Sequence, residues 1–533
     1  AGYDAIIVEG KAETPVYLWI HGGENELRDA SHIWGKFTKE TEEIIRRETR
    51  EERARIACVG PGGENLVRFA CVMNDLVDAA GRTGTGAVMG SKKLKAVAVR
   101  GTQKLKLADE ARFRELAKMA NQQAWAGWGK ELHDDGTDGG LDDLNATGRL
   151  PTKNFRQGTF EGAEKITGET MTDTILIDRK ACFGCRVGCK RIVEAKEPYV
   201  VHSAYGGPEY ETVAALGSFC MNDNLVAIAK ANELCNKYTI DTISTGVTIA
   251  FAMECYENGL LTKEDTDGLD LTWGNHNAIV QLVEKIGKRE GIGNLLAEGT
   301  KRAAERIGRR AERFAMQVKG LELPMHEPRG KKGLGLSYAT SNRGGCHCQA
   351  PHDDYWGEGY TRDKSGFYFI PEIGLDPAIA KHRLYVGPEK AKMVTIGQNW
   401  WTVVSALGIC IFTPFPVGIH MQTLVDMISS GTGWDVTASE LITVGERAWN
   451  LARAFNVREG ITRKDDVLPD RFSKPLPDGL YKGQSISKAE LEKLKDYYYQ
   501  YRGWNNNGIP TREKLEELGL KYVADELKKL GKL

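Results

Sequence analysis

The chain has 533 residues, 41% hydrophobic and 27% charged, with a formal net charge of −1 and a mean hydropathy of −0.40. These values are ordinary for a globular protein, and the length suffices for roughly two to four domains with a sizeable core. Near-neutral charge without a basic or acidic block excludes the electrostatic attraction on which nucleic-acid and anionic-membrane binding depend.

The eleven cysteines, an odd number in a long chain, do not suggest a secreted disulfide framework. No apolar run is long enough to cross a bilayer, and residues 1–3 show no charged-then-apolar leader. We therefore expect a protein without a membrane anchor or signal peptide, at home in a reducing and anaerobic cytoplasm.

The first hundred residues contain short β-branched runs at residues 3–9, 16–20, 55–59 and 94–99, which predict strands. A glycine-rich segment, residues 80–87, precedes the last of them. Closely spaced glycines let backbone amides approach a ligand, and Arg82 could clamp a phosphate, but a plain tight turn fits the segment equally well. The order of residues does not match a P-loop.

From about residue 108 the hydrophobic period becomes helical. We expect helices at residues 225–237, 243–258, 278–286, 295–307 and 438–455. Asp223 and Asn224 are candidate caps, and Gly259 and Gly287 are candidate stops. Residues 133–145, rich in Asp and Gly, predict an exposed loop. The fold class is thus α+β, with a β-rich domain at 1–107 followed by mainly helical domains at 108–317 and 318–533.

Cys182, Cys185 and Cys189 form a C-x2-C-x3-C run in which glycines separate the thiols. Four cysteine thiolates are the usual ligands of an iron–sulfur cluster, whereas zinc commonly uses two well-separated pairs. We therefore predict a redox cluster with a distant fourth cysteine; three unrelated thiols in a loop are the plainer alternative. The basic residues around the run would offset an anionic cluster: Lys180, Arg186, Lys190 and Arg191.

Cys410, which closes the apolar segment 400–410, is our candidate for the fourth ligand. The other candidates lie inside predicted strands or helices and are expected to be packing residues: Cys58, Cys71, Cys220, Cys235 and Cys255. Cys346 and Cys348 flank His347. Alternate residues share a face, so the two cysteines might hold a metal while His347 points away; we favour a functional His347 alone, because no nearby residue completes a Cys/His ligand set.

Glu211 follows the cysteine run in the sequence Gly-Pro-Glu-Tyr-Glu-Thr. A carboxylate beside a buried cofactor can have a raised pKa and accept a proton. An acidic residue that merely stabilises a helix N-terminus is an equally good interpretation.

Taken together, these segments resemble the aldehyde ferredoxin oxidoreductases, which are tungsten enzymes with a bis-pterin cofactor and a [4Fe–4S] cluster. The resemblance extends nearly from end to end and is carried by residues 1–4, 86–96, 182–189, 207–211, 240–244, 342–347, 407–410 and 502–504. Chains of that family normally begin upstream of Ala1, with strands that help form the base beneath the cofactor.

The resemblance implies a role for individual residues. Cys182, Cys185, Cys189 and Cys410 would hold the cluster. Two pterin-binding hexapeptides fall on residues 236–241 and 405–410; their expected contacts are Asn236, Ile240, Asp241, Ser405 and Ile409. Asn236, Thr239 and Ser405 depart from the family's pattern. The pterin phosphates, bridged by Mg²⁺, would lie at Arg82, Thr83 and Gly84.

Glu211 and His347 fall at the family's catalytic Glu and His, and His326 stands where a substrate-orienting Tyr occurs elsewhere in the family. In the implied mechanism His347 polarises an aldehyde carbonyl, Glu211 accepts a proton, and two electrons leave through the cluster to ferredoxin. The metal is tungsten or molybdenum, and the partner is ferredoxin or a small ferredoxin-like subunit, with a homo-oligomer possible.

Two other functions compete with this one. The first is a thioester reductase, because class II benzoyl-CoA reductases share the scaffold; the segments at 207–211 and 342–347 favour the aldehyde branch. The second is a non-catalytic electron-transfer subunit that holds only the iron–sulfur cluster.

Overall fold

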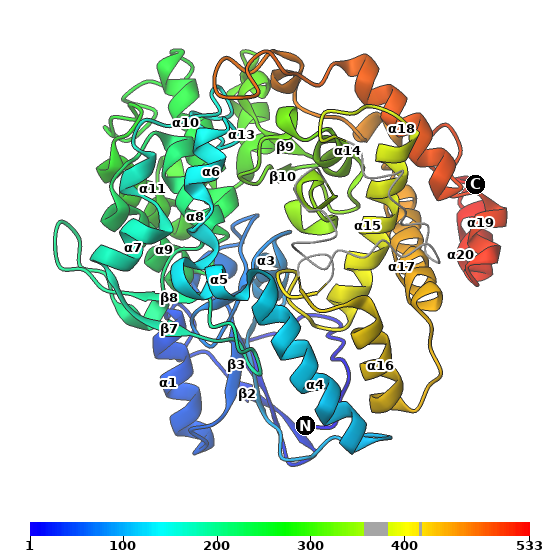
Figure 1. Ribbon diagram of the computed structural model, residues 1–533. Helices are drawn as coiled ribbons and strands as arrows, with labels where there is room; N and C mark the ends of the chain where they lie inside the picture. Colours follow the sequence, from blue (N-terminus) through cyan, green and yellow to red (C-terminus); the bar gives the residue numbers. More distant parts are fainter. Residues whose placement is uncertain (357–381, 415–417) are drawn as a thin grey trace.

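The computed structural model describes residues 1–356, 382–414 and 418–533. A small sheet lies at one end of the molecule, and two groups of helices stand on it (Figure 1). The green helices between residues 210 and 307, α8 to α13, form one group. The yellow-to-orange helices between residues 388 and 458, α15 to α17, form the other. The predicted α+β class is confirmed.

Six strands of the described chain form the N-terminal sheet. Their spatial order is β2 (Glu24–Asp29), β1 (Val16–His21), β6 (Leu94–Arg100), β3 (Arg55–Cys58), β4 (Val72–Asn74) and β5 (Asp78–Ala80). Only the β1–β6 pair among these neighbours is parallel. Helix α1 (Thr38–Thr49) shares a core with the sheet, and β5 leads directly into the glycine-rich segment.

The strand predicted at residues 3–9 is wrong. These residues form neither strand nor helix, and Ile7 is 86% exposed. β-branched residues favour a strand only where a neighbouring strand pairs with them and one face is buried; here neither condition is met.

The first group of helices packs around α10 (Thr242–Glu257), which is buried along nearly its whole length. It contacts α8 (Tyr210–Leu216) and lies near α9 (Leu225–Tyr238) and α11 (His276–Lys288). The Asn224 side chain accepts a hydrogen bond from the amide of Ala227 and caps α9, as predicted. Asp223, the other candidate cap, pairs with Lys165 instead.

The two predicted helix stops behave differently. Gly259 follows α10 with a φ of 66° and ends it as expected. Gly287 lies inside α11, which ends at Lys288; a Cβ at Gly287 would be 2.4 Å from the ring of Tyr238, so close packing explains this glycine. The helix predicted at 295–307 is broken into α12 (Ile292–Leu296) and α13 (Gly299–Ile307).

Residues 133–145 do not form an exposed loop. They contain the end of α5 (Lys130–Asp135), a 3₁₀ turn and most of α6 (Leu141–Ala146), with Asp138 only 1% exposed. A Cβ at Gly168 would be 2.4 Å from the carbonyl oxygen of Asp135, so α7 (Gly168–Thr174) lies directly against this turn. Gly136, Asp138 and Leu141 are buried in this segment, whereas Gly140, Asp142 and Asp143 are exposed.

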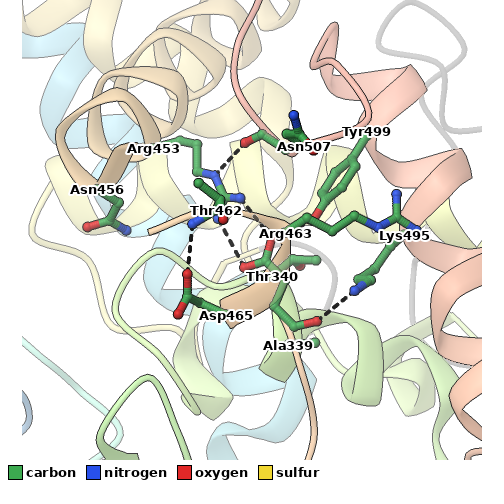
Figure 2. A network of polar contacts seen from close by, with 12 residues as sticks. Ala339, Thr340, Arg453, Asn456, Thr462, Arg463, Asp465, Lys495, Tyr499 and Asn507 are labelled. Atoms are coloured by element: carbon green, nitrogen blue, oxygen red, sulfur yellow. Dashed lines mark hydrogen bonds and ion pairs between the residues drawn. The ribbon is translucent and has the colours of Figure 1, made fainter. Parts of the chain in front are cut away.

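The second group contains α15 (Pro388–Ala406), α17 (Ala438–Arg458) and α18 (Lys488–Arg502), which enclose buried tryptophans. The helix predicted at 438–455 is confirmed. Beside them lies a network of polar contacts that includes Arg453, Arg463 and Tyr499 (Figure 2). Arg453 also pairs with the buried Asp466, at 2.8 and 3.0 Å. Lys319 and the hydroxyl of Tyr499 also contact Asp466, at 2.8 and 2.6 Å.

The largest hydrophobic core includes Val67, Ile249 and Leu334, one from each of the three predicted domains. The proposed domain boundaries therefore stay a prediction. None of the helices in the described ranges carries an apolar stretch long enough to cross a bilayer.

Candidate redox active site

A cavity of about 680 Å³ opens between the sheet and the first group of helices. The glycine-rich segment, the loop that follows β8 (Lys190–Val193) and the start of α10 contribute to its walls. Most of the cofactor-binding and catalytic residues that were predicted from sequence line this cavity: Arg82, Thr83, Asn236, Ile240, Asp241, Glu211 and His347.

Arg82 and Asp241 form a buried ion pair at this cavity, with 3.1 Å between Nε and a carboxylate oxygen. Asp241 also caps α10 by accepting hydrogen bonds from the amides of Ile243 and Ser244. Arg82 donates to the carbonyl of Glu322, while its Nη1 has no hydrogen-bond partner within the described ranges. A buried guanidinium with an unused donor is suited to bind an anion such as a phosphate.

The glycines of the segment have a second reason to be there. Gly84 has a φ of 75°, and a Cβ on it would lie 2.2 Å from the carbonyl oxygen of Arg68. A Cβ on Gly86 would lie equally close to the carbonyl oxygen of Cys71. These glycines are therefore required by packing against the 68–71 backbone, and Gly84 itself does not line the cavity.

Glu211 lies in the first turn of α8, between two histidines from distant segments. Its Oε2 accepts a hydrogen bond from the amide of Met325 at 2.9 Å. Its Oε1 lies 3.1 Å from Nε2 of His326 and 3.6 Å from Nε2 of His347. Oε1 has no hydrogen bond of good geometry to any described residue, so it remains available to accept a proton or a substrate hydrogen bond.

The histidines around Glu211 are neutral. Burial lowers the pKa of His347 to about 3, although the carboxylate of Glu211 opposes the shift. Burial also lowers the pKa of His326 and of His352, a third imidazole whose ring lies 4.5 Å from that of His326. A neutral imidazole can donate one hydrogen bond and accept another, so this group can orient a carbonyl without adding charge.

His347 is carried by a segment that is anchored from the opposite side. Asn342 donates to the carbonyl of Trp449 at 3.1 Å and accepts from Asn456 at 2.6 Å, both on α17. Asn456 lies at the edge of the polar network in Figure 2. A Cβ on Gly344 would be 2.4 Å from the carbonyl oxygen of Val318, so this glycine permits the close approach to β9 (Gln317–Val318). The helical network thereby fixes where His347 meets the cavity.

Arg343, which also lines the cavity, donates two hydrogen bonds to Sγ of Cys346, at 2.8 and 3.2 Å. Burial alone would raise the pKa of Cys346. Hydrogen bonding with Cys348 and the guanidinium groups of Arg343 and Arg82 nevertheless hold it below its ordinary value. Cys346 is thus stabilised as a thiolate, which sequence reasoning did not anticipate.

The three clustered cysteines lie in the connection between β7 (Leu176–Lys180) and β8. Desolvation, Glu209 and Cys410 raise the pKa of Cys189 to about 12, in that order, and Cys410 also raises the pKa of Cys182. The influence of Cys410 on both pKa values agrees with its predicted place near the triplet, and its role as the fourth ligand stays a prediction. Four thiols that repel one another's ionisation are what a cationic iron cluster would stabilise.

The basic residues near the triplet have specific partners. Arg191 is buried and donates to the carbonyls of His133, Asp134 and Cys189, which fixes the shape of the loop. Lys190 pairs with Asp78 at the cavity wall. Their charges are thus partly used inside the protein.

Several residues near the site were not identified from sequence. Glu209 lines the cavity, accepts a hydrogen bond from Thr137 at 2.5 Å and has its pKa raised by burial. Its place in the Gly-Pro-Glu-Tyr-Glu segment was the available signal. Ser405 and Ile409, expected as pterin contacts, lie at and just beyond the end of α15 and not on the cavity wall, so their role stays a prediction.

The site combines buried acid–base groups at a cavity with four cysteines whose pKa values influence one another. This combination is typical of a metal-dependent oxidoreductase. The comparisons agree. The N-terminal domain of aldehyde ferredoxin oxidoreductase matches residues 1–101, and domains 2 and 3 of the same family match residues 113–520. The chain belongs to the aldehyde ferredoxin oxidoreductase family.

Tungsten-containing aldehyde ferredoxin oxidoreductases from Pyrococcus furiosus and Thermococcus kodakarensis are 42% and 41% identical to the chain. Each alignment covers 98% of this chain and 82% of the relative. The WOR-like subunit of an aliphatic sulfonate oxidoreductase from Pyrococcus furiosus is 31% identical over the whole chain and covers 82% of that protein.

A solved structure, the active-site complex BamBC of benzoyl coenzyme A reductase with 1,5-dienoyl-CoA, has a TM-score of 0.81 and 27% identity. The match covers 98% of this chain and 82% of that one. Family membership thus supports a tungstopterin oxidoreductase. The similar proteins are named for different substrates, so the substrate of this chain must be inferred from its site.

The residues present fit such cofactors. The cavity is lined by a buried arginine with an unused donor, which suits the phosphates of a pterin. It is also lined by amide and carboxylate side chains, which suit the polar rings. The four cysteines supply the donor set of an iron–sulfur cluster.

Proposed function

We propose that the chain oxidises aldehydes to carboxylic acids and passes the electrons through a [4Fe–4S] cluster to ferredoxin or a small ferredoxin-like subunit. In the balanced reaction an aldehyde and water give a carboxylic acid, two protons and two electrons. The observation that carries this proposal is the arrangement of Glu211 between His326 and His347 at the cavity.

The protein's own residues have separate tasks in this reaction. The neutral His347 donates a hydrogen bond to the aldehyde oxygen and polarises the carbonyl. Glu211 accepts the proton that is released when oxygen adds to the carbonyl carbon. His326, whose Nε2 contacts the same carboxylate oxygen as His347, orients the substrate beside Glu211.

A tungsten or molybdenum bis-pterin would be held by Arg82, Thr83, Asn236, Ile240 and Asp241, with Mg²⁺ at the pterin phosphates. Such a group supplies two-electron redox chemistry. Cys182, Cys185, Cys189 and Cys410 would hold the cluster. Cys182, Cys410 and the fully exposed Phe183 lie at the surface, so electrons can leave there towards a partner in a reducing cytoplasm.

The test is a substrate panel with the anaerobically purified protein. Aldehydes of increasing size are compared with aromatic acyl-CoA thioesters, with ferredoxin and a viologen dye as electron carriers. Aldehyde-dependent reduction of ferredoxin supports the proposal. Reactivity with thioesters alone contradicts it.

Thioester reduction remains the second candidate because of the structural likeness to the benzoyl coenzyme A reductase complex. We expect His326 to influence which of the two substrates is accepted, because its side chain lies beside Glu211. A preference for acyl-CoA in the same panel would favour this candidate.

A further inference from the structure

Cys346, His347 and Cys348 bring three metal-ligand atoms together beside the cavity. One ligand atom from each of these residues lies within 4.8 Å of the other two. The backbone creates this arrangement: Cys346 precedes the 3₁₀ turn His347–Gln349, and its Sγ accepts a hydrogen bond from the amide of Cys348 at 3.3 Å. The two sulfurs therefore lie over the same turn and do not alternate along an extended strand.

The environment favours a thiolate at Cys346. The guanidinium of Arg343 donates to its sulfur through two nitrogens, at 2.8 and 3.2 Å. Metal ions bind the thiolate form of cysteine, and hydrogen bonds to a ligating sulfur are compatible with coordination. Arg343 can therefore stay in place when a cation binds.

His347 has one ring nitrogen to spare. Its Nε2 faces the carboxylate of Glu211 at 3.6 Å, whereas its Nδ1 is buried and lacks a hydrogen-bond partner in the part of the chain that the structure describes. A metal-binding histidine usually directs its second nitrogen to a carboxylate, which fixes the ring. Glu211 occupies that position.

We propose that Cys346, His347 and Cys348 bind one soft divalent cation of the zinc class, with a fourth coordination position left open. Two sulfurs and one imidazole with an open position form a known zinc ligand set. Neither cysteine lines the large cavity, so the site lies beside it. Occupation takes His347 out of its contact with substrate and inhibits turnover.

Zinc binding is tested on anaerobically purified protein whose iron content shows a filled cluster. One equivalent of Zn²⁺ is added, and X-ray absorption at the zinc edge identifies the ligands. We expect two sulfurs at about 2.3 Å and nitrogen at about 2.0 Å. Zinc with four sulfurs, zinc with only oxygen and nitrogen ligands, or no bound zinc would each overturn the proposal.

The variants sharpen this result. Cys348→Ala and Cys348→Ser should each weaken zinc binding at least tenfold, while Cys255→Ala, which removes a buried cysteine far along the chain, should leave it unchanged. A zinc affinity equal to that of wild type in both Cys348 variants would overturn the proposal. The absorption spectrum does not depend on which substrate is oxidised, so failure of the proposed function and failure of this site are distinguishable.

Discussion

The surroundings of Glu211 and the surroundings of the cysteines Cys182 and Cys410 differ in how far they are buried. Around Glu211 the protein buries neutral imidazoles and leaves selected donors and acceptors without partners among the described residues. Cys182 and Cys410 instead lie at the surface, and Arg191 fixes the loop that carries Cys182. In the proposed function, proton transfer therefore takes place where desolvation lowers the pKa of the imidazoles, and electron transfer takes place where a partner can approach.

The largest expected effect is on the electron side. Cys410→Ala removes the proposed fourth ligand, so ferredoxin-dependent turnover should be abolished and bound iron should fall by more than half. Iron analysis and the spectrum of the reduced cluster measure this. Cys255→Ala, a buried cysteine that the account assigns to packing, is the matched control. Full iron content in Cys410→Ala would separate Cys410 from the cluster.

The next effect is on the proton side. Glu211→Gln keeps the shape of the side chain but cannot accept a proton, so kcat should fall by about 10²- to 10⁴-fold. Metal and iron contents should stay unchanged, in contrast to Cys410→Ala. The exposed Glu161→Gln serves as control. A kcat within a factor of about two of wild type would dismiss Glu211 as the base.

A third prediction concerns the buried ion pairs of Asp466, which stabilise the helices that anchor the His347 segment. Asp466→Asn leaves Arg453 and Lys319 buried without their carboxylate, at a cost of about 3–5 kcal/mol. The melting temperature should drop, and turnover should suffer because Asn342 and His347 are anchored on the same helix, α17. Cluster iron should persist. Asp470→Asn, at an exposed ion pair, should change neither stability nor turnover measurably.

The smallest effect is on pH dependence. His326, His347 and His352 have lowered pKa values when folded, so the unfolded chain binds more protons between their folded values and about 6.5. Stability is therefore fully present above about pH 6.5 and is lost as pH falls below it, by about 1.4 kcal/mol per pH unit for each such histidine.

His326→Gln should flatten this dependence, measured as melting temperature from about pH 7.5 to 6. His32→Gln, at an exposed site, should leave the slope unchanged. A slope in His326→Gln as steep as that of wild type would contradict the assignment of a buried, neutral His326.

Sequence reasoning predicted what depends on local pattern. The cap of α9 by Asn224 and the stop at Gly259 follow from short-range chemistry, and each has the expected geometry. The cysteine run was also found from local spacing, and its role as a set of cluster ligands stays a prediction. The five cysteines expected to be packing residues are indeed buried: Cys58, Cys71, Cys220, Cys235 and Cys255.

What failed depended on tertiary context. Residues 133–145 look like a loop because Asp and Gly usually lie in solvent, yet they form short helical turns in which Gly136, Asp138 and Leu141 are buried. Gly287 looks like a helix end, but it is small because Tyr238 packs on it. The link of Arg343 to Cys346 joins side chains three residues apart through a turn that periodicity does not reveal.

The most direct test of the account is the iron, tungsten and molybdenum content of one anaerobically purified sample. The account predicts about four iron atoms per chain together with tungsten or molybdenum, because the two sides of the site serve one reaction. Iron without either heavier metal would contradict it and leave a protein that only transfers electrons.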